Sequence, residues 1–356
     1  MIHNRKIFLE DRAEIEIKPD TFFVFRDLAQ DRNPSKVECE AVEKRYHVFN
    51  SKELGTGTFA IVKLAIDKET GERLACKMVA ITKVRLATPG GNVASAQAIQ
   101  QEISILKQIT HPNIVQIKDV IQSPTTVYIF LTRVMGGELF DYINNNGGIP
   151  EHEAKFIFYQ VLRAVRYLHR RNITHRDLKL ENLLLESAVP FSRIMLTDFG
   201  LAKMPASTLE RMQTKCGTVV YLAPEIIDSP PGTGYSKSVD CWSLGVLLYT
   251  ILSGQMPFGN VDNPSVVSKA IKSTTFSMEG QWGTRDPTPE ARDLVLKLLN
   301  VNAKERLTVE GALLHPWIAK QKETLDKLYV KMLRKSHLPA PSFQSEPIKA
   351  DALKAK

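Results

Sequence analysis

The sequence predicts an α+β fold, with strand-like segments concentrated toward the beginning and helices dominating afterwards. Residues 46–54 and 62–67 are strand-like, and Val127 to Leu131 is an apolar run of strand length. Apolar residues recur with helical spacing over 97–108 and again over 156–168. Two different periods in one chain of ordinary domain size therefore favour a mixed fold.

Composition excludes several classes of protein. The 356 residues are 43% hydrophobic and 24% charged, as in ordinary globular proteins. The net charge of +8 is scattered, which argues against a direct nucleic-acid partner. Charged residues occur throughout the first twenty residues, so we expect no signal peptide. No apolar run approaches the roughly 20 residues that are needed to span a bilayer. The four cysteines form no C-x-x-C pair, which indicates a reducing compartment and a soluble, intracellular protein without a membrane partner.

The N-terminal part predicts a small β element followed by a linker. Ala13, Ile15 and Ile17 alternate with charged residues, and the turn at Pro19-Asp20 leads into an apolar run ending at Phe25. We expect two antiparallel strands within residues 1–28. Residues 29–45 are polar and predict a linker.

The segment after the second helical stretch concentrates charge in a way that a buried segment does not. It reads His175-Arg176-Asp177-Leu178-Lys179-Leu180-Glu181-Asn182 and matches H-R-D-L-x-x-x-N, the catalytic loop of protein kinases. From here the chain resembles a protein kinase over residues 46–318. The resemblance implies a two-lobed fold with a small β-rich N-lobe containing one main helix and a larger helical C-lobe. It also implies ATP and Mg²⁺ as cofactors.

Further motifs of the family follow in the family's order. Gly55-Thr56-Gly57-Thr58-Phe59-Ala60 resembles the Gly-rich loop, with alanine in place of the third glycine. Lys77 ends a strand in the pattern Ala-x-Lys, and the family pairs this lysine with the ATP phosphates and with a helix carboxylate, here Glu102. The residues that the resemblance assigns to ATP binding are Leu54, Gly55, Gly57, Phe59, Val62, Ala75, Lys77, Glu102, the gatekeeper Leu131, the hinge residues Thr132 and Val134, and Glu138.

The resemblance assigns the chemistry to a small set of residues. Asp177 would accept the proton of the substrate hydroxyl, and Lys179 would stabilise charge on the transferring phosphoryl group. Lysine two residues after the aspartate is the serine/threonine-kinase form. Asn182 and Asp198, the latter in Asp198-Phe199-Gly200, would bind magnesium.

The activation segment runs from Asp198 to Glu225 and contains two threonines of interest. Thr214 is expected to be phosphorylated, so that its phosphate pairs with Arg176. Thr218 lies in Gly-Thr-x-x-Tyr, where the family's hydroxyl bonds the catalytic aspartate and lysine, although regulatory phosphorylation is the alternative.

Scaffold roles follow from the same resemblance. Glu225, in Ala-Pro-Glu, is expected to form a buried ion pair with Arg306, and Asp240 to bond the backbone of the catalytic loop. Glu138 and Glu181 place negative charge beside the peptide groove, so substrates with upstream Arg or Lys are expected.

Within the kinases, the chain is similar to the calmodulin-dependent-kinase-like group, through Gly136-Gly137-Glu138-Leu139-Phe140-Asp141. Residues 9–25 resemble the last strands of a forkhead-associated (FHA) domain, truncated so that the phosphate-binding loops are missing. With the long loop over 82–95 and the two activation-segment threonines, this resembles the FHA-containing DNA-damage checkpoint kinases. That resemblance implies a nuclear protein that forms a homodimer for trans-autophosphorylation, although Lys331 to Lys335 is too thin a basic cluster for an import signal.

Three alternatives remain. A calcium/calmodulin-dependent kinase would carry a basic amphipathic helix after the domain, and residues 320–335 are basic and partly apolar. We expect a short helix over Lys320 to Met332, with Leu325, Leu328, Tyr329 and Met332 on one face, then a disordered tail to 356, and we do not expect calmodulin as a partner. A pseudokinase scaffold would lack catalytic residues that are all present here. A phosphothreonine-binding module would need the missing strands.

Overall fold

A computed structural model of the chain describes residues 14–18, 21–24, 39–56, 60–80, 107–146, 148–198, 218–227, 236–258, 269, 271 and 286–336. The chain divides into two compact units. The small unit comprises residues 1–82 and 118–131, and the large unit comprises residues 83–117 and 132–356. Strands dominate the small unit and helices dominate the large one, which confirms the α+β prediction.

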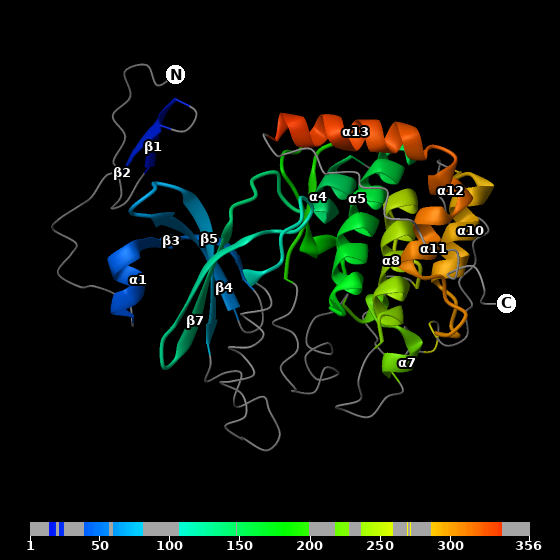
Figure 1. Cartoon of the computed structure of the whole chain (residues 1–356), viewed down its shortest axis with the longest axis horizontal. Coiled ribbons are helices and arrows are strands. Elements are labelled where there is room, and N and C mark those ends of the chain that lie inside the picture. The colour runs from blue at the N-terminus through cyan, green and yellow to red at the C-terminus, as the bar shows by residue number, and fades with distance from the viewer. Residues whose placement is uncertain are drawn as a thin grey trace. The chain divides into compact units, whose positions relative to one another are not determined.

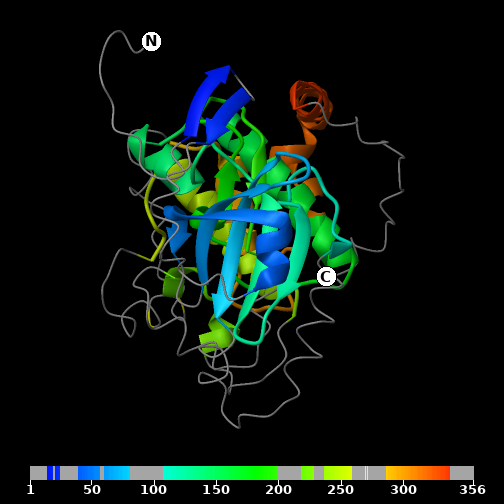
Figure 2. The same ribbon diagram turned by 90° about the vertical axis from the view of Figure 1, so that its left-hand side faces the viewer.

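The small unit is built on a five-stranded sheet with the order β3-β4-β5-β7-β6. Figure 2 shows these strands side by side, in blue to green. The strands β3 and β4, and β4 and β5, pair antiparallel. Apolar side chains from several strands, among them Leu74 and Phe130, form its core. The strands are β3 (Tyr46–Thr56), β4 (Ala60–Asp67), β5 (Arg73–Ala80), β6 (Ile117–Gln122) and β7 (Thr126–Thr132).

The expected linker is wrong in its last part, because residues Glu40–Arg45 form helix α1. Val42 of α1 is fully buried in the core of the small unit. At the end of the helix, the Arg45 guanidinium lies 3.1 Å from a carboxylate oxygen of Asp119. Val42 is the only large apolar residue of the segment, and the core around Val42 includes residues from strands far away in sequence. The hydrophobic pattern of the segment therefore gives no sign of a helix.

The two strands expected near the N-terminus are present. They are β1 (Glu14–Lys18) and β2 (Thr21–Val24), and they pair antiparallel as a separate two-stranded sheet.

The large unit is organised around helices α5 (Glu151–Arg170) and α8 (Ser238–Ser253). Residues 239–252 of α8 are all buried, because the helix is apolar all round and is enclosed by other helices. Figure 1 shows α5 and α8 among the surrounding helices. These are α4 (Leu139–Asn145), α7 (Pro224–Ile227), α10 (Pro289–Leu298), α11 (Val309–Leu314), α12 (Pro316–Ala319) and α13 (Lys322–Lys335).

The expected C-terminal helix is present as α13, three residues longer at its end than expected and starting two residues later. Figure 1 shows it across α5, and its buried side chains include Leu325, Tyr329 and Met332. Leu328, expected on the same face, is partly buried against the same core. The remaining tail, from residue 337, lies outside the described residues.

A short hairpin in the large unit lies between Asn182 and Asp198, two residues of the predicted site. Strands β8 (Leu183–Leu185) and β9 (Ile194–Leu196) pair antiparallel, with Leu183 opposite Leu196. A 3₁₀ turn at Leu180–Asn182 precedes β8, and a second one spans Thr218–Tyr221. Among the helices that the structure describes, none has the length and apolarity to cross a bilayer.

Candidate active site

The loop between α5 and β8 is shaped by a buried carboxylate from α8. Asp240 is fully buried, and its two carboxylate oxygens accept hydrogen bonds from the backbone N–H groups of His175 and Arg176, both at 2.8 Å. Arg176 has a φ of 69°, in the left-handed region. The expected bond between Asp240 and the loop backbone is therefore present, and it stabilises a backbone conformation that non-glycine residues rarely adopt.

Three predicted residues meet at the exposed side of this loop. The Asn182 amide nitrogen donates to the Asp177 backbone carbonyl at 2.7 Å and to its carboxylate oxygen Oδ2 at 3.0 Å. The Lys179 ammonium also lies 3.0 Å from Oδ2, and the Asp177 side chain keeps 28% of its surface exposed. The arrangement orients a solvent-accessible carboxylate that can accept a proton, with a cation beside it.

The β8–β9 hairpin brings Asn182 and Asp198 toward one end. Leu183 stands opposite Leu196, and the Thr197 N–H donates to the Asn182 carbonyl at 2.9 Å, so Asp198 follows one residue later beside the 3₁₀ turn. Because the amide nitrogen of Asn182 is bonded to Asp177, its amide oxygen is the atom left to hold a cation. An amide oxygen and a carboxylate are ligands that Mg²⁺ prefers, so this donor set fits the expected ion. In the part of the chain that the structure describes, no three His, Cys, Asp or Glu side chains form a metal-binding group.

The small unit aligns three predicted residues across its sheet. Gly55 of β3 stands opposite Val62 of β4, and Val62 stands opposite Lys77 of β5. A Cβ built on Gly55 would meet nothing within 4 Å, so open space lies over this glycine. Leu54 is 44% exposed, and Ala75 and Lys77 are half-buried on β5. Gly57, Phe59 and Glu102 lie outside the described residues.

The segment that follows β7 is held to β8. Leu131 and Thr132 end β7, and Val134 follows them, all half-buried. The Gly136 N–H donates to the Leu185 carbonyl at 2.8 Å, and a Cβ at Gly136 would lie 2.4 Å from that oxygen. Glycine is required here because the two backbones approach too closely for any side chain. Glu138, two residues on, forms a bridge with Leu184 of β8 and precedes α4.

The expected ion pair between Glu225 and Arg306 is present and bidentate. Guanidinium nitrogens of Arg306 lie 2.7 and 2.9 Å from the two carboxylate oxygens of Glu225, and the Arg306 side chain has 0% of its surface exposed. Arg306 also donates to the backbone carbonyls of Ser238 and Asn300 at 2.9 and 2.8 Å. The end of the activation segment is thereby tied to α8 and to the chain before α11.

Tyr221 extends this platform toward the catalytic loop. Its side chain is buried, and burial, followed by the charge of Glu181, raises the pKa of its hydroxyl. Ser243 of α8 donates to the Tyr221 carbonyl at 2.9 Å. Glu181, expected to contact basic substrate residues, is therefore close to the segment that ends in α7. Thr214 lies outside the described residues, as does the side chain of Thr218.

His169 belongs to none of the motifs identified in the sequence, and its role appears only in the structure. It is buried, and its Nε2 lies 2.8 Å from the Asp240 carboxylate, so Asp240 bonds α5 as well as the catalytic loop. The two residues are 71 positions apart in sequence, and nothing local to His169 indicates this partner.

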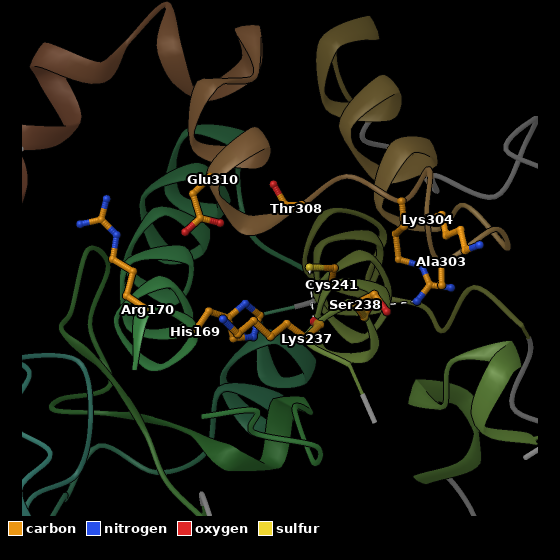
Figure 3. Close-up of a pocket in the computed structure, with 10 residues that line it drawn as sticks. His169, Arg170, Lys237, Ser238, Cys241, Ala303, Lys304, Thr308 and Glu310 are labelled. Atoms are coloured by element: carbon orange, nitrogen blue, oxygen red, sulfur yellow. Dashed lines mark hydrogen bonds between the residues drawn. The ribbon is translucent and has the colours of Figure 1, made fainter. Parts of the chain in front are cut away.

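A cavity of about 280 Å³ lies beside His169, and Figure 3 shows Ser238, Cys241 and Lys304 on its wall. The Cys241 thiol donates to the Lys237 carbonyl at 3.6 Å, and burial raises the pKa of this thiol to about 12. None of the residues predicted to bind ATP or to act in catalysis is among those that line the cavity.

Comparisons with known proteins agree with this geometry. A family model described as protein kinase domain matches residues 48–318. The chain is 39% identical to myosin light chain kinase A of Dictyostelium discoideum, over 82% of this chain and 94% of that protein. It is 35% identical to a second protein of that organism, named "Probable serine/threonine-protein kinase fhkC", over 96% of this chain but only 56% of the relative. The chain thus spans little more than half the length of that relative.

A solved structure shares the fold. The crystal structure of Rad53 1-466 in complex with AMP-PNP superposes with a TM-score of 0.65 and 32% sequence identity, covering 78% of this chain and 66% of that one. The two-lobed fold expected from the sequence, with a β-sheet lobe and a helical lobe, is therefore confirmed.

Proposed function

Because this chain belongs to the protein kinase family and its kinase domain is of the serine/threonine type, we propose that the whole protein phosphorylates serine and threonine in other proteins. The observation that carries the proposal is the Asp177 carboxylate, oriented by Asn182 and Lys179 at 3.0 Å each. In this proposal, Asp177 accepts the proton of the substrate hydroxyl as that oxygen bonds to the γ-phosphorus of ATP, and ADP leaves. Lys179 balances negative charge on the transferring group.

The nucleotide-binding residues complete this assignment. Lys77 binds the phosphates, the backbone at Gly55 approaches them, and the backbone of Thr132 and Val134 holds the adenine. Asn182 and Asp198 would hold Mg²⁺, which would neutralise negative charge on the ATP phosphates. The supporting observations are the row Gly55–Val62–Lys77 and the hairpin that places Asn182 near Asp198.

Substrates are proposed to carry Arg or Lys upstream of the phosphoacceptor. Glu181 lies in the catalytic loop, and after burial its charge is the next cause that raises the pKa of the Tyr221 hydroxyl. Glu138 adds a second carboxylate where the chain bridges to β8. Two acidic side chains attract a basic peptide and repel an acidic one.

Activation is proposed to occur by phosphorylation of Thr214, or of Thr218, in trans within a transient homodimer. A phosphate on Thr214 would pair with Arg176, whose backbone is fixed by Asp240. The pairing would order the activation segment, which ends at the ion pair of Glu225 with Arg306.

A role in DNA-damage checkpoint signalling, in the nucleus, is proposed from the resemblance of residues 9–25 to the last strands of an FHA domain. The antiparallel β1–β2 hairpin is compatible with such a remnant, which would be followed by a linker, the catalytic domain over 46–318 and a C-terminal tail. The second candidate is a calcium/calmodulin-dependent kinase. Against it, the apolar face of α13 is buried on the large unit, so calmodulin would first have to detach that helix.

The proposal is tested by mass spectrometry of the dephosphorylated protein after incubation with Mg-ATP, beside Asp198→Ala. A peptide with upstream arginine and a matched peptide with alanine at that place serve as substrates. We expect phosphate on Thr214 or Thr218 and faster labelling of the arginine peptide, in the wild type only. Absence of transfer to any serine or threonine, with ATP bound, would contradict the kinase proposal. Equal labelling of both peptides would contradict only the substrate preference.

A further inference from the structure

The C-terminal helix α13 places one polar group inside the large unit. Tyr329 is fully buried, and its hydroxyl donates to the side-chain oxygen of Asn113 at 2.6 Å, across 216 positions of sequence. Two further residues contact the aromatic ring, since the Arg163 guanidinium lies 4.2 Å from its centroid and Tyr159 meets it edge-on. These contacts help to fix the position of the ring and of its hydroxyl.

Asn113 connects Tyr329 to strand β9 by hydrogen bonds. Its side-chain nitrogen donates to the Ile194 carbonyl at 2.8 Å and to Gln160 Oε1 at 2.9 Å. Its backbone carbonyl accepts from the Leu196 N–H at 2.9 Å, and Gln160 Oε1 accepts from the Ile194 N–H at the same distance. Asn113 and Gln160 are both fully buried, so each lost bond leaves a group that water cannot reach.

Strand β9 ends two residues before Asp198. Between them, Thr197 donates its N–H to the Asn182 carbonyl at 2.9 Å, and its own carbonyl lies 3.0 Å from His175 Nε2. A shift of β9 along its axis would therefore move Asp198 relative to Asn182. These two residues are the proposed magnesium ligands.

We propose that Tyr329 is a positioning residue for phosphoryl transfer, acting through Asn113 and β9 on Asp198. Helix α13 would then contribute to phosphoryl transfer through Tyr329, although it follows the residues matched by the kinase family model. The inference rests on the proposed kinase function. A merely structural Tyr329 would contribute packing and stability but would leave the position of β9 unchanged.

The test is Tyr329→Phe in the full chain, which removes the hydroxyl and keeps the ring. Its matched control is Tyr142→Phe. This change removes a hydroxyl that is bonded to Glu153 at 2.8 Å and that takes no part in the hydrogen bonds between Asn113 and β9. Both variants are assayed well below their melting temperatures. The readouts are kcat as a function of Mg²⁺ concentration and hydrogen exchange of the backbone amides over 194–198.

We expect Tyr329→Phe to raise the half-saturating Mg²⁺ concentration three- to tenfold and to speed exchange over 194–198, with neither change in Tyr142→Phe. Asn113→Ala should give the same shifts, and the double variant should add nothing, because both residues act in one chain of contacts. Additive losses, or unchanged exchange and Mg²⁺ dependence with only a lower melting temperature, would overturn the inference. A wild type without kinase activity would contradict the proposed function, and the exchange comparison would still decide this inference.

Discussion

The carboxylate of Asp240, at the start of α8, accepts a hydrogen bond from the backbone N–H of Arg176 at 2.8 Å, 64 positions away in sequence. Arg176 sits in the left-handed region at that point, with a φ of 69°. A buried helix thus fixes the shape of the loop that carries Asp177. The geometry of the proposed proton acceptor therefore depends on a buried carboxylate of another helix.

Asp240→Asn is expected to lower activity more than its effect on folding explains. An amide nitrogen cannot accept, so one of the bonds to His169, His175 or Arg176 is lost inside the protein. We expect a loss of about 2 kcal/mol in the free energy of unfolding and roughly a tenfold loss in kcat. Urea unfolding and steady-state kinetics measure both. Asp141→Asn, at an exposed position of α4, is the control, and an Asp240→Asn enzyme with full kcat would refute the positioning role.

Asp177→Asn should separate chemistry from stability. The side chain is 28% exposed, so its replacement by an isosteric amide costs little folding free energy. We expect kcat to fall by about 10² to 10⁴, the usual contribution of a positioned proton acceptor, with the melting temperature nearly unchanged. Single-turnover labelling of a serine peptide measures the step directly. Turnover within a factor of five of the wild type would exclude Asp177 as the proton acceptor.

The ion pair between Glu225 and Arg306 should stabilise the large unit, because one partner is wholly buried. Arg306→Met removes the guanidinium and leaves the Glu225 carboxylate unpaired, at an expected cost of about 3 kcal/mol in unfolding free energy. The control is Lys327→Met, whose pair with Glu323 is exposed on both sides and should be worth less than about 0.5 kcal/mol. Chemical unfolding of both variants gives the comparison. Similar losses in the two would mean that burial does not strengthen the Arg306 pair.

Stability should fall in acid through His111. Burial, with smaller contributions from Arg163 and Arg171, lowers the pKa of His111 to about 3. Its Nδ1 accepts from the Asn113 N–H at 3.1 Å, a bond that the protonated ring cannot make. In the unfolded chain His111 binds a proton as pH falls below about 6.5, whereas in the folded chain it stays neutral down to about pH 3. The contribution of His111 therefore makes the free energy of unfolding decline as pH falls from about 6.5 toward 3.

The measurement is unfolding free energy at pH 7 and pH 5 for the wild type and for His111→Gln. We expect the wild type to lose on the order of 1 kcal/mol more than the variant between these values, because the glutamine does not titrate. Equal losses in both proteins would show that other groups carry the acid sensitivity.

Functional residues that lie within short motifs could be predicted from the sequence. Residues whose roles depend on partners far away in sequence could not. The segment from His175 to Asn182 could be interpreted because its residue types are specific and adjacent. The role of His169 was missed because Asp240 lies 71 positions further on. The helix at Glu40–Arg45 was missed because one buried valine, Val42, gives no period. Tyr329 was placed on the correct face, yet a periodic pattern cannot indicate that its hydroxyl bonds Asn113.

Replacement by alanine should destabilise the protein at Gly136 but not at Gly55. A Cβ at Gly136 would lie 2.4 Å from the Leu185 carbonyl and 2.6 Å from the Ser187 Cα, both backbone atoms, so Gly136→Ala should cost about 2 kcal/mol or more in unfolding free energy. A Cβ at Gly55 meets nothing within 4 Å, so Gly55→Ala should keep stability within about 0.5 kcal/mol. If ATP phosphates occupy that space, Gly55→Ala should instead raise the KM for ATP several-fold, because the methyl group stands where the backbone approaches the ligand. Thermal melts with ATP titrations test both, and an unchanged KM in Gly55→Ala would mean that the phosphates lie elsewhere.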